Sequence, residues 1–317
     1  MSRPRVSIVM PNYNHARLLP TSLGAVLRQG VPADEVLVID DASTDNSREV
    51  LAEFAAKWPQ LKVIPNAHNL GVCATMNRGL ELATGDYVAF LAADDEVLPG
   101  WLEHLVPLLE KHPEAGLVCG LAEWRDHSTG INWHQGVRMP SETKYFPPVE
   151  MVQLGKRGAL SIAGQNALFK RSALVAAGGW RPELRWFTDW FGACVVGFRQ
   201  GICHVPEVLS VFNLHQASYY NTAESRQQRQ ETMERLLGLL ESDRYADVAP
   251  QIAGSGLLGG FGWPMFTLVV CRHRRFLGWS FLRHMARRTA EATGRRFFPR
   301  WLAQLCLRLF YRSKVRR

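Results

Sequence analysis

The stretch that decides the fold is VLVIDDASTDNS, residues 36–47. It starts as an apolar, β-branched run typical of a buried strand and then reaches two adjacent acids, Asp40 and Asp41. Adjacent carboxylates raise the free-energy cost of ionising one another, so their place at a strand end indicates a ligand or a cation there. A purely structural interpretation stays open, because Asp, Ser and Asn also form turns, and Ser43 or Asp45 could begin the helix that follows.

Two further runs repeat the pattern of the strand expected at residues 35–40. VSIVM (6–10) and YVAFLA (87–92) are short, apolar and rich in β-branched residues, and the segments between the three runs have helical length and pattern. This alternation predicts an α/β fold with a mostly parallel central sheet and flanking helices. In such a sheet, ligands bind outside the carboxyl ends of the strands.

The third run leads into another acidic strand end, Asp94-Asp95-Glu96. Three consecutive acids make an oxygen-rich pocket that suits a hard divalent cation such as Mg²⁺ or Mn²⁺. The glycines between the second and third runs have simple structural interpretations, with Gly71 as a turn and Gly85 as a helix C-cap. Three polar strand ends at one edge of a sheet favour a ligand site over three unrelated turns.

Composition narrows the class of protein. The chain has 317 residues, 47% of them hydrophobic, and ten Trp, which is enough to bury a sizeable core and excludes a disordered chain. Its six cysteines never reach CxxC spacing, which argues against a zinc site or a disulfide framework and predicts free thiols in a reducing compartment. The N-terminus enters a strand-like run directly, so no secretory signal is expected.

Four blocks of the sequence resemble the successive motifs of the family 2 glycosyltransferases, which have the GT-A fold with its Rossmann-like sheet. They are VSIVMPNYNHARLLPTSLGAVLRQ, EVLVIDDASTDNS, NLGVCATMNRGLELATGDYVAFLAADDEVLPGWL and ALFKRSALVAAGGWRPELRWFTDWFGACVVGFRQG. The resemblance covers roughly residues 4–220, and the ordered set of blocks is far more specific than any single motif.

The resemblance implies a nucleotide-sugar donor site. The loop PNYN would hold the nucleotide base, with Pro11 and Tyr13 near the ring. Asp41 would contact the uracil or the ribose, and Asp40 would support that loop. Asn69, in NLGVCATMN, matches a further donor-binding block of the family.

The resemblance also implies a divalent metal, Mn²⁺ or Mg²⁺, as cofactor. Asp94 and Asp95 correspond to the end of the family's DxD element, and His215 stands where relatives often have a His that binds metal or diphosphate. The chain departs from the family at two positions: Ala92 replaces the first acid of the element, and Met76 stands where many relatives carry Arg. Metal coordination would then rest mainly on Asp94.

The catalytic base implied by the resemblance is Asp189, in RWFTDWF. Partial desolvation between Thr188 and Trp190 would raise the pKa of this carboxyl and improve it as a base near neutral pH. Taken without the family, a cap of the helix that follows is the slightly favoured interpretation of Asp189. Trp186, Trp190 and Arg199 could line the acceptor site because aromatic faces suit sugar rings, although Trp is more often core.

These parts predict an inverting glycosyltransferase. One base and no second carboxylate placed as a sugar-binding nucleophile fit a single displacement at the anomeric carbon. The family and the basic tail together suggest transfer from a UDP-sugar to a glycan or lipid-linked saccharide in cell-surface polysaccharide synthesis. The alternative is a non-catalytic nucleotide-sugar-binding scaffold of a glycan assembly complex, which Ala92 and Met76 keep open.

Two domains are expected. Residues 1–222 would form the GT-A domain, with a nucleotide-sugar half (1–110) and an acceptor half (111–222), and residues 223–317 a helical, basic extension. Within the extension, the uncharged run 252–271 has nearly transmembrane length, but its five glycines and one proline make it a poor continuous span.

The extension is strongly basic and amphipathic. Residues 271–317 carry 13 Arg and one Lys against one Glu, whereas the rest of the chain has a net charge of −5. Leu277, Phe281 and Met285 fall on one helical stripe. These features predict a peripheral protein whose tail lies on an anionic membrane, at its cytoplasmic inner face. Docking on a partner protein or a second copy is the next alternative; nucleic acid is disfavoured, because the bulky apolar residues exceed what phosphate binding needs.

Overall fold

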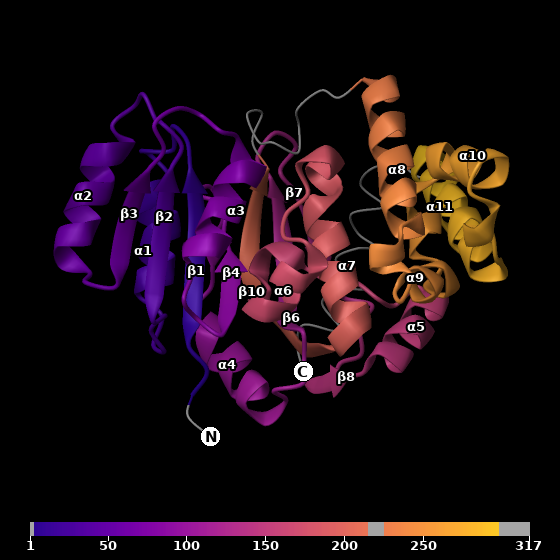
Figure 1. Cartoon of the computed structure of the whole chain (residues 1–317), viewed down its shortest axis with the longest axis horizontal. Helices are drawn as coiled ribbons and strands as arrows, with labels where there is room; N and C mark the ends of the chain where they lie inside the picture. Colours follow the sequence, from indigo (N-terminus) through magenta and orange to yellow (C-terminus); the bar gives the residue numbers. More distant parts are fainter. Residues whose placement is uncertain (1–2, 215–224, 298–317) are drawn as a thin grey trace. The chain divides into compact units, whose positions relative to one another are not determined.

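The computed structural model describes residues 3–214 and 225–297 (Figure 1). The chain forms two compact units, and each is described by itself. Unit 1 comprises Met1–Gly136, Ser141–Pro148 and Ile162–Thr222, and unit 2 comprises Val137–Pro140, Val149–Ser161 and Ala223–Arg317.

The first half of unit 1 alternates strands and helices along the chain, as the sequence predicts. Its strands lie parallel in the order β3-β2-β1-β4 (Figure 1). The elements are β1 (Val6–Asn12), α1 (Leu19–Leu27), β2 (Glu35–Asp40), α2 (Ser47–Lys57), β3 (Leu61–Pro65), α3 (Val72–Leu82) and β4 (Tyr87–Phe90). The α/β prediction is confirmed, and the three apolar runs are the strands β1, β2 and β4.

The second half of unit 1 extends the same sheet with mixed strand directions. β9 pairs antiparallel with β4 and continues the sheet toward β6, β10 and β5. The remaining elements are β5 (Glu96–Val97), α4 (Trp101–Lys111), β6 (Leu117–Asp126), β7 (Ile131–Gln135), β8 (Lys144–Phe146), η1 (Gly164–Asn166), β9 (Leu168–Lys170), α6 (Arg171–Ala177), η2 (Pro182–Phe187), α7 (Thr188–Gln200) and β10 (Ile202–Leu214). The sheet is therefore all parallel in its first half and mixed in its second, where β6 and β10 are parallel and the other pairs are antiparallel.

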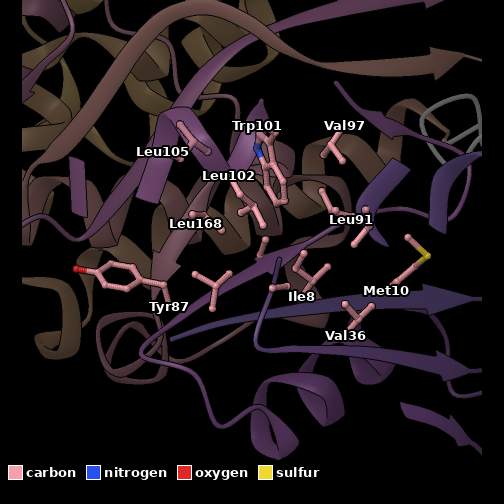
Figure 2. Close-up of a cluster of buried hydrophobic side chains, with 14 of the residues drawn as sticks. Ile8, Met10, Val36, Tyr87, Leu91, Val97, Trp101, Leu102, Leu105 and Leu168 are labelled. Atoms are coloured by element: carbon pink, nitrogen blue, oxygen red, sulfur yellow. The ribbon is translucent and has the colours of Figure 1, made fainter. Parts of the chain in front are cut away.

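One face of the sheet buries the main hydrophobic core. Side chains of alternating residues, among them Ile8, Met10 and Val36, point from the strands toward α1 and α4, as the period of two in a strand requires (Figure 2). From α4, Trp101 and Leu105 fill the layer above them. Burial of this apolar surface is the main source of the stability of the sheet.

Helix α3 covers the opposite face. Gly79 lies so close to Val9 that a Cβ atom would sit 2.2 Å from its Cγ1, and the absence of a side chain lets the helix approach β1. Gly85 is not the helix C-cap that the sequence suggests, because α3 ends at Leu82 and Ala83 occupies the cap. It lies instead against β1, where a Cβ would be 2.7 Å from the backbone nitrogen of Ser7.

Unit 2 is helical. Its elements are α5 (Pro148–Arg157), α8 (Arg226–Glu241), η4 (Asp243–Tyr245), α9 (Ala249–Ser255), η5 (Leu257–Phe261), α10 (Trp263–Cys271), η6 (Arg274–Phe276) and α11 (Trp279–Phe297). The uncharged run 252–271 is broken at Gly256 and Gly262, which both have positive φ. Over the described part of the chain, no helix has the length and apolar character needed to cross a membrane.

Helix α11 carries two apolar stripes rather than the single one expected. Of the stripe predicted from the sequence, Phe281 and Met285 are only 1% and 5% exposed inside unit 2, whereas Leu277, before the helix begins, is 41% exposed. Trp279 is 89% exposed and Leu282 is 37% exposed, three residues apart on the outer face. The buried stripe is thus unavailable to a membrane, and the outer stripe is accessible.

Candidate active site

Asp40 joins the loops that follow β1 and β2. Its Oδ1 accepts a hydrogen bond of 2.9 Å from Asn12 Nδ2, and its Oδ2 forms an ion pair of 3.2 Å with Arg48 Nε. Asn12 Nδ2 also donates to Ser43 Oγ at 3.2 Å. The buried Asp40 side chain therefore supports both loops, which is the role that the resemblance gives it.

A second set of hydrogen bonds joins the same loops further out. Asn14, with φ of 58°, accepts at its side-chain oxygen from the backbone amide of Thr44 at 2.7 Å. Asp45 Oδ2 in turn accepts from the Ala16 amide at 2.9 Å and Oδ1 from the Ser47 amide at 2.9 Å. Asp45 thus does act at the start of α2, as the structural interpretation of DASTDNS proposes, and it ties the β1 loop at the same time.

Asp41 binds a different segment, the loop between β3 and α3. Its Oδ1 accepts from Asn66 Nδ2 at 2.6 Å and from the Leu70 amide at 2.8 Å, and its Oδ2 accepts from the Gly71 amide at 2.9 Å. Asn69 accepts from the same Gly71 amide at 3.0 Å. Two of the expected donor-binding residues, Asp41 and Asn69, therefore meet at the N-terminus of α3.

The expected base-binding residues lie beside this assembly. Pro11 is the second-last residue of β1, paired in register with Ile39, and Tyr13 follows the strand with 45% of its surface exposed. Asp41 itself is only 3% exposed. Tyr13 therefore offers an accessible ring at the loop, whereas Asp41 mainly shapes the backbone of the site.

The acidic strand end after β4 is held by Asn213, near the end of β10. The Asn213 amide donates to Asp95 Oδ1 at 2.8 Å, and its side-chain nitrogen donates to the Asp94 carbonyl at 3.0 Å. Burial raises the pKa of the Asp95 carboxyl well above its ordinary value, and the neighbouring charges of Asp94 and Glu96 raise it further. A cation bound here would relieve this repulsion.

The donor set at this strand end fits a divalent cation held jointly with a substrate. Within residues 3–214 and 225–297, no three His, Cys, Asp or Glu side chains are grouped as a complete metal site. Mg²⁺ in phosphate-binding enzymes is usually held by one or two carboxylates together with substrate phosphates and waters. Asp94 and Asp95 supply such a pair of hard oxygen ligands. His215, the third expected ligand, lies outside the described residues.

Asp189 stands in the first turn of α7. Burial raises the pKa of its carboxyl, although the Trp190 amide donates to Oδ1 at 2.7 Å and opposes this rise. The pKa of Cys73, in the first turn of α3, is raised to about 11 by burial and by the charges of Asp189 and Glu183. The expected base therefore lies within electrostatic reach of the helix end whose amide Asp41 holds.

The expected acceptor residues are only partly brought together. Trp186 stacks on Phe187 with ring centroids 3.8 Å apart, and Trp190 meets the edge of the same ring at 6.5 Å, so both surround the start of α7. Arg199 lies in the last turn of α7, ten residues from Asp189, which corresponds to about 15 Å along a helix. The structure thus separates Arg199 from the other expected acceptor residues.

The sequence interpretation missed three asparagines that shape the site: Asn66, Asn77 and Asn213. Asn66 directly follows β3, and Asn213 is the second-last residue of β10. At such strand ends, a side-chain amide can hydrogen-bond to groups of neighbouring loops, as Asn66 does with Asp41 and Asn213 with the Asp94 carbonyl. Asn77 lies within α3, where Asn is a poor helix former, so its position in the sequence was itself a signal of a side-chain contact.

The sequence of the chain is similar to those of known glycosyltransferases. The chain is 36% identical over 132 residues to the uncharacterized glycosyltransferase YibD of Escherichia coli (strain K12), a match covering 42% of this chain and 38% of that protein. It is 28% identical over 233 residues to an uncharacterized glycosyltransferase of Nostoc sp. (strain PCC 7120), covering 72% of this chain and 70% of the other. The first match thus spans well under two thirds of its relative.

Two solved structures share the fold. The S. aureus protein TarS (residues 1–349), solved with UDP-GlcNAc, has a TM-score of 0.62 at 16% identity and covers 78% of this chain and 72% of its own. The mannosyltransferase PcManGT from Pyrobaculum calidifontis, solved with GDP-Man and Mn²⁺, has a TM-score of 0.56 at 18% identity, with 99% and 86% covered. The family model described as Glycosyl transferase family 2 matches residues 7–176, more than half of the chain. The chain therefore belongs to glycosyl transferase family 2.

Proposed function

We propose that the protein is an inverting glycosyltransferase that moves a sugar from a nucleotide donor, a UDP-sugar, to a glycan or lipid-linked saccharide in surface polysaccharide synthesis. The observation that carries the proposal is the position of Asp189. Its charge reaches Cys73 in the first turn of α3, directly after the Gly71 amide that Asp41 holds. The proposal therefore assigns the base and the donor-binding loop to the same end of α3.

Asp189 acts as the general base in this proposal. It takes the proton from the acceptor hydroxyl as the oxygen attacks the anomeric carbon, and the bond from that carbon to the donor diphosphate breaks on the opposite side. The raised pKa of its carboxyl brings its basicity closer to neutral pH, where proton transfer is more favourable. A single displacement of this kind inverts the configuration at the anomeric carbon.

Asp94 and Asp95 hold the diphosphate end of the donor site. A divalent cation bound by these carboxylates would supply Lewis-acid stabilisation of the charge that develops on the leaving diphosphate. Asn213 contributes by fixing the Asp94 carbonyl and the Asp95 carboxyl in place. The loop is therefore ordered by the protein itself.

The proposal also specifies the nucleotide of the donor. TarS is solved with UDP-GlcNAc and PcManGT with GDP-Man and Mn²⁺, so both nucleotides occur on this fold. UDP is favoured by the resemblance of the DDASTD loop to the family's uracil-binding element. Binding of GDP in place of UDP would change the proposed donor.

Calorimetric titration of UDP into the protein, with Mn²⁺ and then with EDTA, tests the donor site. We expect metal-dependent binding that is lost in Asp94→Ala and kept in Asp243→Ala, an exposed acid of unit 2 that serves as the matched control. Binding of GDP and not UDP would replace the donor. Binding without turnover of any nucleotide sugar would favour the scaffold alternative.

We also propose that unit 2 places the enzyme on the inner face of an anionic membrane. The outer stripe of α11, with Trp279 and Leu282, lies beside the exposed Arg283, and no acidic residue occurs between Val248 and Ala290. Trp and Leu suit the headgroup region, and arginines are attracted to anionic lipids. This surface replaces the membrane-binding stripe predicted from the sequence, in which Phe281 and Met285 are buried.

A further inference from the structure

Asn77, in the middle of α3, forms two hydrogen bonds to a backbone segment more than a hundred residues away in the sequence. Asn77 Oδ1 accepts from the Trp180 amide at 2.8 Å, and Asn77 Nδ2 donates to the Trp180 carbonyl at 2.7 Å. One side chain thereby satisfies both polar groups of one residue. Such a pair of bonds fixes position and orientation together, which a single hydrogen bond does not.

The segment around Trp180 is held by further contacts. The Trp180 ring is buried and meets the edges of Phe90 and Phe169, with centroids 4.8 Å and 5.7 Å away. Gly179 has a φ of +64°, and a Cβ on it would lie 2.7 Å from Asn77 Oδ1. The glycine therefore allows the backbone to reach the asparagine, and the ring anchors the segment to β4 and β9.

The same segment continues into the catalytic turn. The Arg181 amide donates to Thr188 Oγ1 at 2.6 Å, and Thr188 is the first residue of α7, directly before Asp189. The buried Thr188 hydroxyl is the acceptor that joins the two ends of the loop. Covalent and hydrogen bonds thus run without a break from Asn77 through Trp180 and Arg181 to Asp189.

We propose that Asn77 is a positioning residue that sets the place of Asp189 relative to the donor-binding end of α3. Asn77 lies four residues after Cys73, so both are on one face of the helix. The inference rests on the proposed function for the role of Asp189. It adds a residue that touches neither substrate nor metal and acts through Trp180 and Thr188.

Cys73 gives a readout that does not depend on turnover. Its thiol is the group on α3 whose pKa the charge of Asp189 raises, so its reactivity reports whether that charge stays in place. The rate of iodoacetamide alkylation at Cys73, followed by peptide mass spectrometry from pH 7 to 11, gives a profile that reports the relative thiolate fraction in each variant. Asp189→Asn calibrates the change expected when the charge is removed.

The test compares Asn77→Leu and Thr188→Val, which remove the hydrogen bonds, with Thr188→Ser, which keeps the hydroxyl. In the two disruptive variants we expect the Cys73 profile to move toward that of Asp189→Asn. We also expect kcat for hydrolysis or transfer from a UDP-sugar to fall by about tenfold to a hundredfold, with the donor KM within about twofold. Thr188→Ser should resemble the parent in both measurements.

Unchanged Cys73 profiles in both Asn77→Leu and Thr188→Val would overturn the proposal, even if the variants were less stable. The use of two variants on opposite sides of the path separates positioning from a local folding defect. If the parent binds no nucleotide and turns over no UDP-sugar, the proposed function fails. The thiol profiles would still decide whether Asn77 holds Asp189 in place.

Discussion

The carboxylates of Asp40 and Asp41 bind different loops, although the two residues are adjacent in the sequence. Asp40 binds Asn12 at the end of β1 and Arg48 in α2, whereas Asp41 binds the Leu70 and Gly71 amides at the start of α3. Each carboxylate has its own donors, so the repulsion between the neighbours is offset on both sides. This arrangement accounts for two acids at the end of a buried strand.

Asp41→Asn is expected to loosen the loop before α3. The amide nitrogen of Asn cannot accept a hydrogen bond, so either the Leu70 amide or the Gly71 amide loses its bond to residue 41, at a cost of about 1–3 kcal/mol in the free energy of unfolding. Urea unfolding gives that cost, and hydrogen exchange should rise at Leu70 and Gly71. Asp40→Asn is the matched control and should raise exchange near Ser43 instead. Equal exchange patterns in both variants would contradict the separation.

Ala42→Gly is expected to stabilise the protein. Ala42 has a φ of 59°, in the left-handed region that favours glycine. Relief of this strain outweighs the added entropy of the unfolded chain, for a gain of up to about 1 kcal/mol in the free energy of unfolding. Chemical denaturation measures it. Ala42→Val should be destabilising, and a stability unaffected by either change would show that the backbone is unstrained.

Asp189→Asn is expected to lower turnover by about 10²–10⁴-fold while UDP binding persists. Because burial raises the pKa of Asp189 in the folded protein, ionisation costs folding stability. This cost is absent below the unfolded pKa and complete above the folded pKa. The variant should therefore gain more thermal stability over the parent at pH 8 than at pH 4. Loss of UDP binding together with turnover would point to a structural role instead.

The buried His204 predicts an acid-labile fold. Burial lowers the pKa of this imidazole from 6.5 to about 4, so the unfolded chain takes up its proton first as the pH falls. Its contribution is fully present above pH 6.5 and is lost between pH 6.5 and about 4, a decrease of about 3 kcal/mol in the free energy of unfolding. His204→Leu should flatten this part of the stability profile. A parallel profile in the variant would assign the acid sensitivity to other groups.

Trp279→Ser combined with Leu282→Ser is expected to weaken binding to phosphatidylglycerol vesicles. Both side chains leave the outer stripe of α11, and about 1.5–3 kcal/mol of burial is lost for each large apolar group that enters the interface. Val149→Ser, another exposed apolar position in unit 2, is the control. Cosedimentation with vesicles measures the effect. Vesicle binding that is the same in all three proteins would reject this surface as the membrane contact.

The strands of the first half could be predicted because their signals are local. The runs at 6–10, 35–40 and 87–92 are apolar, β-branched and bounded by turn residues, and they form β1, β2 and β4. Their parallel order follows from the helices between them. The polar strand ends then indicate one edge of the sheet, where Asp41 and the Asp94–Asp95 pair do lie.

The rest depends on contacts between distant residues. Nothing near Leu168 in the sequence says that β9 runs antiparallel between β4 and β6, because strand partners are chosen by the assembled sheet. The donors to Asp41 come from amides about thirty residues away. On α11, the helical period places Phe281 and Trp279 on different faces, but only the packing of unit 2 decides which face is buried.

Helix α3 is held at three positions. Asp41 accepts from the amide of Gly71, just before the first helical residue, Trp180 hydrogen-bonds to Asn77, and Val9 packs against Gly79. A tilt or a slide of the helix would break at least one of these attachments. The position of α3 is therefore fixed by its contacts with β1, the β2 loop and the Trp180 segment. In the proposed mechanism, a change in the helix itself would shift the donor-binding loop and Asp189 together, so we expect differences in sugar preference to arise from the segments around α3.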